Sequence, residues 1–102
     1  DSLRREFKFS ILADAAAYDP AAVGEQVMLQ GVVDCFWQEP DGIVILDFKT
    51  DYIDGDLQQK AARYAPQLRA YAQALSRIYQ CPVKKTVLYF FSAGREVEID
   101  PE

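Results

Sequence analysis

The sequence predicts one small domain of the α/β (α+β) class, and three observations support this class. Two β-rich stretches flank a strong turn signal at residues 38–42, and apolar residues recur at helical spacing in residues 66–80. An apolar run follows within residues 84–92, which is typical of a central strand. The expected order is therefore a strand, a β-hairpin, helical structure, a core strand and a short strand in the tail.

The first half of the chain is expected to be mostly strand, with one interruption. Residues 4–11 alternate loosely between apolar and other side chains, as strands do. Residues 13–26 are small and polar and contain both proline and glycine, so they are expected to form a loop. Residues 27–37 and 43–50 are rich in β-forming residues. The QEPDG segment between them favours a turn, so the two stretches are expected to form a hairpin.

Helical structure is expected in the second half, after a break at residues 51–56. Proline destabilises the interior of a helix but suits its first turn. We therefore expect a short helix near residues 57–64 and a second one that begins near Pro66. The second helix has one apolar face, which consists of Leu68, Tyr71, Ala72, Leu75, Ile78 and Tyr79. Residues 97–99 are expected to add a short strand at the end.

Composition limits the classes of function. The 102 residues are 50% hydrophobic, which suits a single domain with a modest core. Histidine is absent, which excludes a Ser-His-Asp triad made by this chain alone, and two cysteines without CxxC spacing fit a reducing cytoplasm. The net charge of −5 disfavours binding of nucleic acid by charge alone. Because residue 1 is not an initiator Met, we expect residues 1–102 to be a fragment of a longer protein.

Charged side chains inside apolar strands are the candidate functional residues. In the second strand of the hairpin the side chains alternate, so Asp47 and Lys49 share one face. If Gln38 pairs with Ile43 around the turn, Asp34 lies directly opposite Asp47, with Cβ atoms about 4.5–5.5 Å apart. A three-residue loop would instead place the two aspartates on opposite faces, unless a bulge corrected the register. We adopt the first register.

A pair of ionised carboxylates that face each other is unstable without a proton, a cation or a bound metal. Mg²⁺ favours oxygen sites that combine one or two carboxylates with water, and Lys49 beside such a site can orient or help deprotonate a water for attack on phosphorus. The alternative is that the D…DxK pattern is a set of solvated charges at strand edges. The apolar surroundings of Asp34, Asp47 and Lys49 favour the functional interpretation.

The order of the motifs is more specific than any one of them. GVVD at residues 31–34 is followed by DFK at residues 47–49, then by the helical stretch YAPQLRAYAQAL and the strand VLYFFSAG. In this combination the chain resembles the PD-(D/E)XK nuclease superfamily, and more narrowly the RecB-type nuclease domain found at the C-terminus of AddA subunits of bacterial AddAB helicase–nucleases. The resemblance covers most of residues 4–99 and implies a restriction-endonuclease-like core, a mixed β-sheet flanked by helices.

The resemblance implies Mg²⁺-dependent hydrolysis of DNA phosphodiester bonds, with Mn²⁺ as an alternative ion. It places Asp34 and Asp47 at catalytic and metal-ligand positions, the backbone carbonyl of Phe48 at a third ligand position, and Lys49 at the position of the catalytic lysine. Behind these, Thr50 and Asp51 extend the motif; a polar strand end is the alternative for both.

A second element of the family lies on the following helix. Gln67 and Tyr71 fill its QxxxY pattern, which contacts substrate or supports the lysine, and their spacing puts both on one helix face. The alternatives are a solvated glutamine and a core tyrosine.

The resemblance also implies a setting for the domain. It is that of an exonuclease domain in an ATP-dependent helicase–nuclease of the bacterial cytoplasm, which acts in double-strand break repair and recombination. The partners are DNA, an AddB-like protein, and ATP bound by helicase domains outside this chain.

The chain departs from the family pattern at its start. RecB-type domains have an upstream helix that brings a histidine or acidic residue to the metal. We expect that helix to be missing here, and the isolated fragment to have weak or no activity. The alternative function is a non-catalytic DNA- or protein-interaction module with the same fold.

Overall fold

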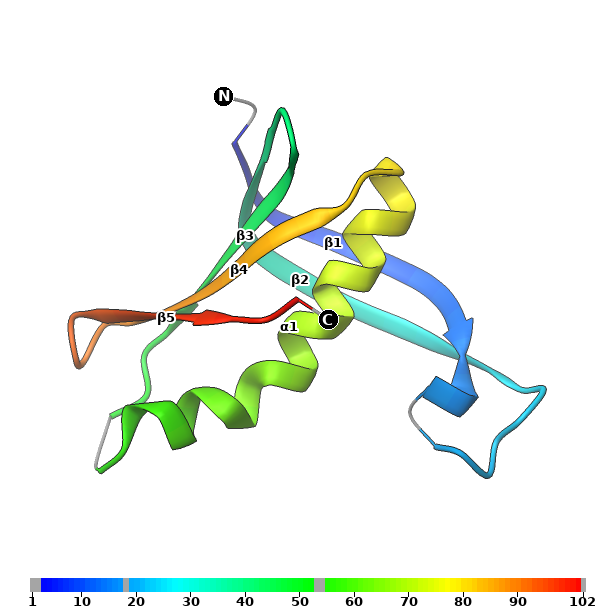
Figure 1. The fold of residues 1–102 in the computed structure, drawn as a ribbon, viewed down its shortest axis with the longest axis horizontal. Helices are drawn as coiled ribbons and strands as arrows, with labels where there is room; N and C mark the ends of the chain where they lie inside the picture. The colour runs from blue at the N-terminus through cyan, green and yellow to red at the C-terminus, as the bar shows by residue number, and fades with distance from the viewer. Residues whose placement is uncertain (1–2, 18, 53–54, 102) are drawn as a thin grey trace.

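A mixed five-stranded sheet with one long helix across it forms the fold (Figure 1). The computed structural model describes residues 3–17, 19–52 and 55–101. The elements are β1 (Arg4–Asp14), a 3₁₀ turn (Ala15–Ala17), β2 (Gln26–Glu39), β3 (Gly42–Lys49), α1 (Leu57–Tyr79), β4 (Val83–Phe90) and β5 (Arg95–Ile99). Strand order in the sheet follows the chain; β3 and β4 are parallel and the other neighbours are antiparallel. The predicted α+β class is confirmed.

The hairpin of β2 and β3 has the predicted register. Gln38 pairs with Ile43, and Cys35 pairs with Leu46. Pairing continues to Glu39 and Gly42, so the connecting loop is one pair tighter than expected, which leaves the register unchanged. The pairing ends at Cys35 and Leu46, one position short of the two aspartates.

The helix differs from the prediction. We expected two helices separated near Pro66, but α1 is continuous from Leu57 to Tyr79 with Pro66 inside it. Figure 1 shows that the first turns of α1 run in a different direction from the rest. Proline lacks the amide that would bond to the carbonyl four residues earlier, and bends at proline are the common result. The bend replaces the predicted break because Leu57, Ala61 and Ala65 before it and Leu68 after it are all buried against the sheet.

Two smaller differences concern strand ends. The first strand extends to Asp14, and the expected loop at residues 13–26 contains a short 3₁₀ turn. Tyr18 in that loop, and Ile53 and Asp54 in the expected break at residues 51–56, lie outside the described residues. The core strand expected at 84–92 is observed as β4, Val83–Phe90, and the tail strand as β5.

The core lies between α1 and one face of the sheet. Ile43 and Ile45 of β3 and Leu88 and Phe90 of β4 are completely or almost completely buried in it, beneath Leu68 of α1 and other helix residues. Asp47 and Lys49 continue the Ile43–Ile45 face, so the sheet directs them toward the helix. The connection from β3 through α1 to β4 is therefore what covers the candidate residues.

The sheet is irregular where Asp34 lies. Val33 and Phe36 both belong to the core under α1, although strict alternation would put them on opposite faces. In β1, the residue opposite Asp34 is Glu6, which has a φ of 51° and is skipped in the pairing between Arg5 and Phe7. A non-glycine residue with positive φ in a strand is strained, and such strain is concentrated at functional sites. This distortion turns Asp34 toward the helix side of the sheet.

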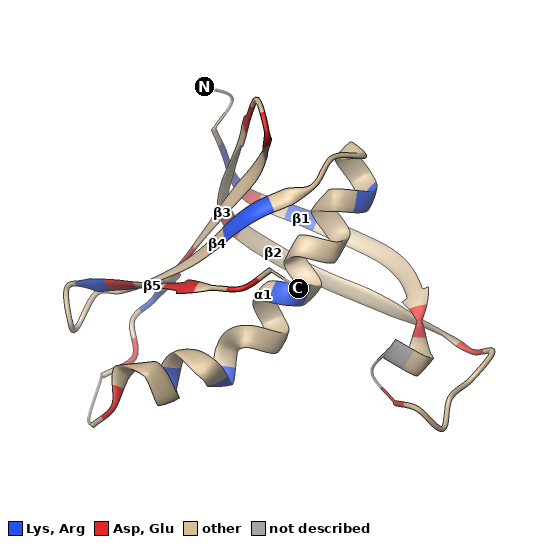
Figure 2. Ribbon diagram, viewed as in Figure 1, with Lys and Arg blue, Asp and Glu red and all other residues tan. Residues whose placement is uncertain are grey.

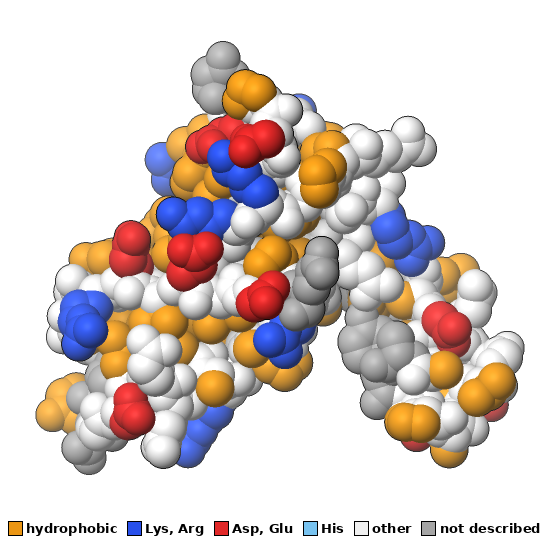
Figure 3. All heavy atoms as spheres, viewed as in Figure 1, with side chains coloured by type: hydrophobic (Ala, Val, Ile, Leu, Met, Phe, Trp, Pro, Cys, Tyr) orange, Lys and Arg blue, Asp and Glu red, His pale blue; other side chains and the backbone are white. Residues whose placement is uncertain are grey.

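Charge is spread over all the elements rather than gathered on one of them (Figure 2). On the face seen in Figure 3, acidic and basic side chains lie interspersed between apolar ones. Within the described part of the chain, no helix is long and apolar enough to span a membrane.

Candidate active site

Asp47 is a buried carboxylate with incomplete pairing. Its exposed fraction is 3%, and no hydrogen bond reaches its Oδ2 atom. The Nζ of Lys49 lies 3.0 Å from that oxygen, so the two charges attract, but without the alignment of a hydrogen bond. Burial, together with the Asp34 carboxyl beside it, raises the pKa of Asp47 to about 6, and Lys49 opposes the rise. An oxygen that is buried, charged and unbonded is ready to take a cation.

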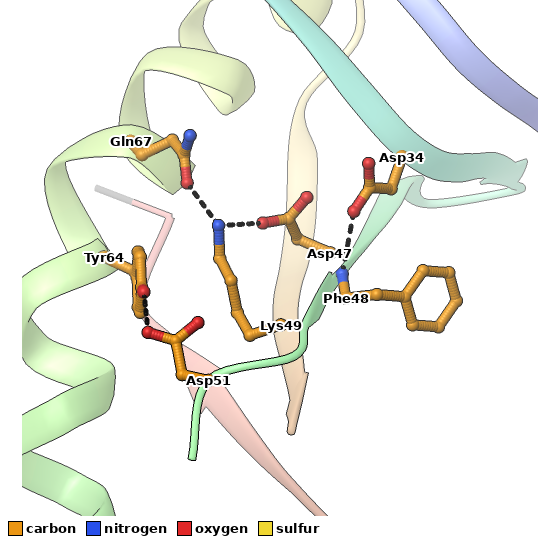
Figure 4. Close-up of polar contacts among 7 residues, drawn as sticks. All are labelled: Asp34, Asp47, Phe48, Lys49, Asp51, Tyr64 and Gln67. Atoms are coloured by element: carbon orange, nitrogen blue, oxygen red, sulfur yellow. Dashed lines mark hydrogen bonds and ion pairs between the residues drawn. The ribbon is translucent and has the colours of Figure 1, made fainter. Parts of the chain in front are cut away.

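Asp34 lies beside Asp47 and holds the end of β3. Its Oδ2 accepts a hydrogen bond of 2.9 Å from the backbone amide of Phe48 (Figure 4). The regular pairing of β2 and β3 has already ended at this point, so the carboxylate occupies the place of a ladder partner. The predicted juxtaposition of the two aspartates on one side of the sheet is observed.

The carbonyl of Phe48 faces the same gap. The neighbouring carbonyl, that of Lys49, accepts a 3.0 Å hydrogen bond from the Phe91 amide on the β4 side. Successive residues of a strand direct their amide and carbonyl to alternate sides, so Phe48 directs both toward β2. Its amide meets Asp34 there, and its carbonyl opens into the space between the separating strands.

These donors fit a magnesium ion. Two carboxylates and one backbone carbonyl are hard oxygen ligands, and Mg²⁺ is usually held by one or two carboxylates with water filling the other positions. No cluster of three or more His, Cys, Asp or Glu side chains able to hold a metal occurs among residues 3–17, 19–52 and 55–101. The pair of aspartates is therefore the carboxylate set that this part of the chain offers.

The two helix residues of the QxxxY pattern have different positions. Gln67 is exposed and its Oε1 accepts a 2.9 Å hydrogen bond from the Nζ of Lys49 (Figure 4). Tyr71 is 7% exposed and packs edge-on against Phe9 at 5.7 Å between ring centroids. Burial, with smaller contributions from Asp47 and Asp34, raises the pKa of Tyr71 to about 12. Gln67 thus joins Lys49, whereas Tyr71 supports the core beneath the site.

Several residues near the site were not identified from the sequence. Arg5, Glu6, Asp34 and Phe48 line a hollow of about 530 Å³. Arg5 is an exposed cation on β1, and no sequence motif connects β1 with the aspartates. The only signal was the charged REF start of an apolar strand, which also occurs at ordinary strand ends.

Tyr64 was missed for a similar reason. Its ring centroid lies 4.2 Å from the Nζ of Lys49, and its hydroxyl donates a hydrogen bond to Asp51 (Figure 4). It precedes Gln67 by three residues, a spacing that puts both on one face of a continuous helix. The predicted break before Pro66 concealed this relationship.

The pKa of Asp47 leads to a prediction about stability. A carboxyl whose pKa is higher in the folded state binds more protons there than in the unfolded chain, so its charge costs stability as pH rises from about 4 to about 6. From an ordinary 3.8 to about 6, the shift corresponds to about 3 kcal/mol of unfolding free energy. In EDTA, Asp47→Asn should therefore become more stable relative to wild type across this window and keep that advantage at pH 8.

The measurement is urea unfolding of both chains between pH 4 and pH 8. The difference between the two free energies of unfolding isolates Asp47, because the remaining carboxyls are common to both. A difference that stays constant with pH would contradict the assigned environment of Asp47. Adding Mn²⁺ at pH 8 should stabilise the wild-type chain and leave the variant nearly unchanged.

Known proteins resemble this chain along almost its full length. The model of the PD-(D/E)XK nuclease superfamily matches residues 1–101. The AddA-type polypeptide of the ATP-dependent helicase/nuclease of Bacillus cereus (strain Q1) is 42% identical over 110 residues, which cover 97% of this chain and 9% of that protein. The corresponding helicase/nuclease polypeptide of Acetivibrio thermocellus is 46% identical over 78 residues, covering 76% of this chain and 6% of that protein. The chain thus spans less than a tenth of the length of these relatives.

A solved structure shows the same fold. That of SSO0001 superposes with a TM-score of 0.65 at 18% sequence identity, covering 96% of this chain and 41% of the other. At this identity the likeness concerns the fold alone, and the mixed sheet with its helix agrees with it. The two aspartates, the lysine and the glutamine meet at the position where the DFK and QxxxY motifs predict a site. The chain belongs to the PD-(D/E)XK nuclease superfamily.

Proposed function

We propose that the chain is the metal-dependent DNA exonuclease domain of an ATP-dependent helicase–nuclease that processes double-strand breaks for recombination in the bacterial cytoplasm. The observation that carries this proposal is the Asp34–Asp47 pair beside Lys49, with one buried, unbonded carboxylate oxygen in the middle. The relatives, which are named as ATP-dependent helicase/nuclease polypeptides, support the setting. The partners we propose are DNA, an AddB-like protein, and ATP bound elsewhere in the full-length protein.

The residues divide the work as follows. Asp34, Asp47 and the Phe48 carbonyl would hold one Mg²⁺, or Mn²⁺ in its place, which supplies a polarised phosphate oxygen and a more acidic water when bound. Lys49, fixed by Asp47 and Gln67, presents its ammonium to the water and the phosphate from the helix side. Positive charge placed in advance where negative charge develops is a large source of rate enhancement.

Arg5 and the hollow beside Asp34 fit the substrate rather than the metal. An exposed guanidinium at the rim of the 530 Å³ hollow can pair with a phosphate next to the one that is cleaved. This placement offsets the overall charge of −5, which otherwise repels DNA.

The proposal is tested with the full-length protein and linear duplex DNA. Cleavage should require Mg²⁺ or Mn²⁺, stop in EDTA and return when metal is added in excess. Asp34→Asn should abolish cleavage under all these conditions. Cleavage that persists in EDTA, or that Asp34→Asn leaves unchanged, would overturn the proposal.

A further inference from the structure

Lys49 is in contact with an aromatic ring as well as with acceptor groups. The Nζ of Lys49 lies 4.2 Å from the centroid of the Tyr64 ring, within the range of a cation–π interaction (Figure 4). Tyr64 is half-buried on α1, and the Lys49 side chain is 15% exposed. Such contacts are stronger when water is largely excluded, as it is here.

The ring itself is held from the other side. The Tyr64 hydroxyl donates a hydrogen bond to Asp51 Oδ2, which raises the pKa of Tyr64 and lowers that of Asp51. Asp51 is fixed in turn: its carboxylate pairs with Lys60 at 3.3 Å, and its backbone carbonyl accepts a 2.6 Å hydrogen bond from the Ser92 hydroxyl. The ring is therefore anchored to the segment that follows β3 and through it to the end of β4.

Three groups thus surround one ammonium from different elements. Asp47 contacts it from β3, while Gln67 and Tyr64 contact it from neighbouring positions on α1. A lysine side chain has four rotatable bonds, and confining it costs conformational entropy. A ring against the charged end removes alternative rotamers without taking a hydrogen-bond position from the ammonium.

We propose that Tyr64 is a positioning residue for Lys49: its ring, anchored by Asp51, keeps the ammonium beside Asp47. The inference rests on the proposed function, because it takes Lys49 as the catalytic lysine. The ring makes the contact with Lys49, and the hydroxyl only fixes the ring. Loss of the ring should therefore cost more than loss of the hydroxyl, and the cost should fall on the chemical step.

The first test is kinetic and uses the full-length protein with Mg²⁺ and linear DNA. Tyr64→Leu should lower kcat for cleavage about tenfold, in keeping with the loss of a partly desolvated cation–π contact, and leave KM within about twofold. Tyr64→Phe should lower kcat less than about threefold. The matched control is Tyr79→Leu, because Tyr79 is also half-buried on α1 and packs against Phe7 and Phe36, far from Lys49. The proposal fails if Tyr79→Leu lowers kcat as much as Tyr64→Leu.

The second test is spectroscopic and independent of activity. In proton NMR of the chain, the ε-methylene resonance of Lys49, assigned by its absence in Lys49→Met, should be shifted upfield by the ring. The shift should remain in Tyr64→Phe and disappear in Tyr64→Leu. A resonance that is unshifted in the wild type would overturn the proposed contact. If the shift is present but the wild-type protein cleaves no DNA, the proposed function fails while the contact between Tyr64 and Lys49 stands.

Discussion

Asp47→Asn in the full-length protein should abolish DNA cleavage, by at least about a thousandfold in kcat, while ATP-driven strand separation continues. The amide keeps the size of the side chain but loses the charge that a divalent ion needs at the buried oxygen. Because Asp47 is 3% exposed and lies inside the sheet, water cannot substitute for the lost ligand. The measurement is release of acid-soluble nucleotides, alongside unwinding of a labelled duplex.

The control for this prediction is Asp41→Asn, which changes an exposed aspartate in the hairpin loop that pairs only with Lys84 in the described contacts. That variant should cleave at the wild-type rate. If Asp47→Asn cleaved at a rate close to that of Asp41→Asn, Asp47 would not be part of the catalytic machinery. Loss of both cleavage and unwinding would point to a folding defect, which the pH-dependent unfolding experiment detects separately.

Lys49→Met should also remove most of the activity, on the order of a hundredfold to ten-thousandfold, but for a different reason. Methionine keeps the length and the packing of the side chain while removing the ammonium that Asp47 and Gln67 hold. The variant should bind Mn²⁺ at least as tightly as the wild type, because no ammonium competes for Asp47 Oδ2.

Calorimetric titration of Mn²⁺ therefore separates the two residues. Asp47→Asn is expected to lose both binding and cleavage, and Lys49→Met to lose cleavage alone. Lys49→Arg should recover little activity, since the broad guanidinium cannot sit between Asp47 and Gln67 in the way that a compact ammonium does. Tight metal binding combined with wild-type cleavage in Lys49→Met would show that the lysine is dispensable.

The hairpin and its two aspartates were predictable because their determinants are local. The QEPDG turn sets the register, and strand alternation then decides which face Asp34 and Asp47 occupy. The motif order added Lys49 and Gln67, and the structure brings all four together. The site was thus accessible from the sequence to the extent that it depends on one hairpin and one helix.

The remainder depends on tertiary contacts. Pro66 predicts a helix break by its own chemistry, but burial of the turns on both sides keeps α1 continuous. The strained φ of Glu6 and the change of alternation after Val33 arise from pairing between strands far apart in the chain. Tyr64 and Arg5 approach the site only because of these features, so no local pattern identified them.

The central claim is that Asp34 and Asp47 hold one divalent ion between the separating ends of β2 and β3. Anomalous diffraction from a crystal soaked in Mn²⁺ tests it most directly. The account predicts a peak within about 2.5 Å of a carboxylate oxygen of each aspartate and of the Phe48 carbonyl. A well-ordered site with no peak there, in a crystal that takes up Mn²⁺ elsewhere, would contradict it.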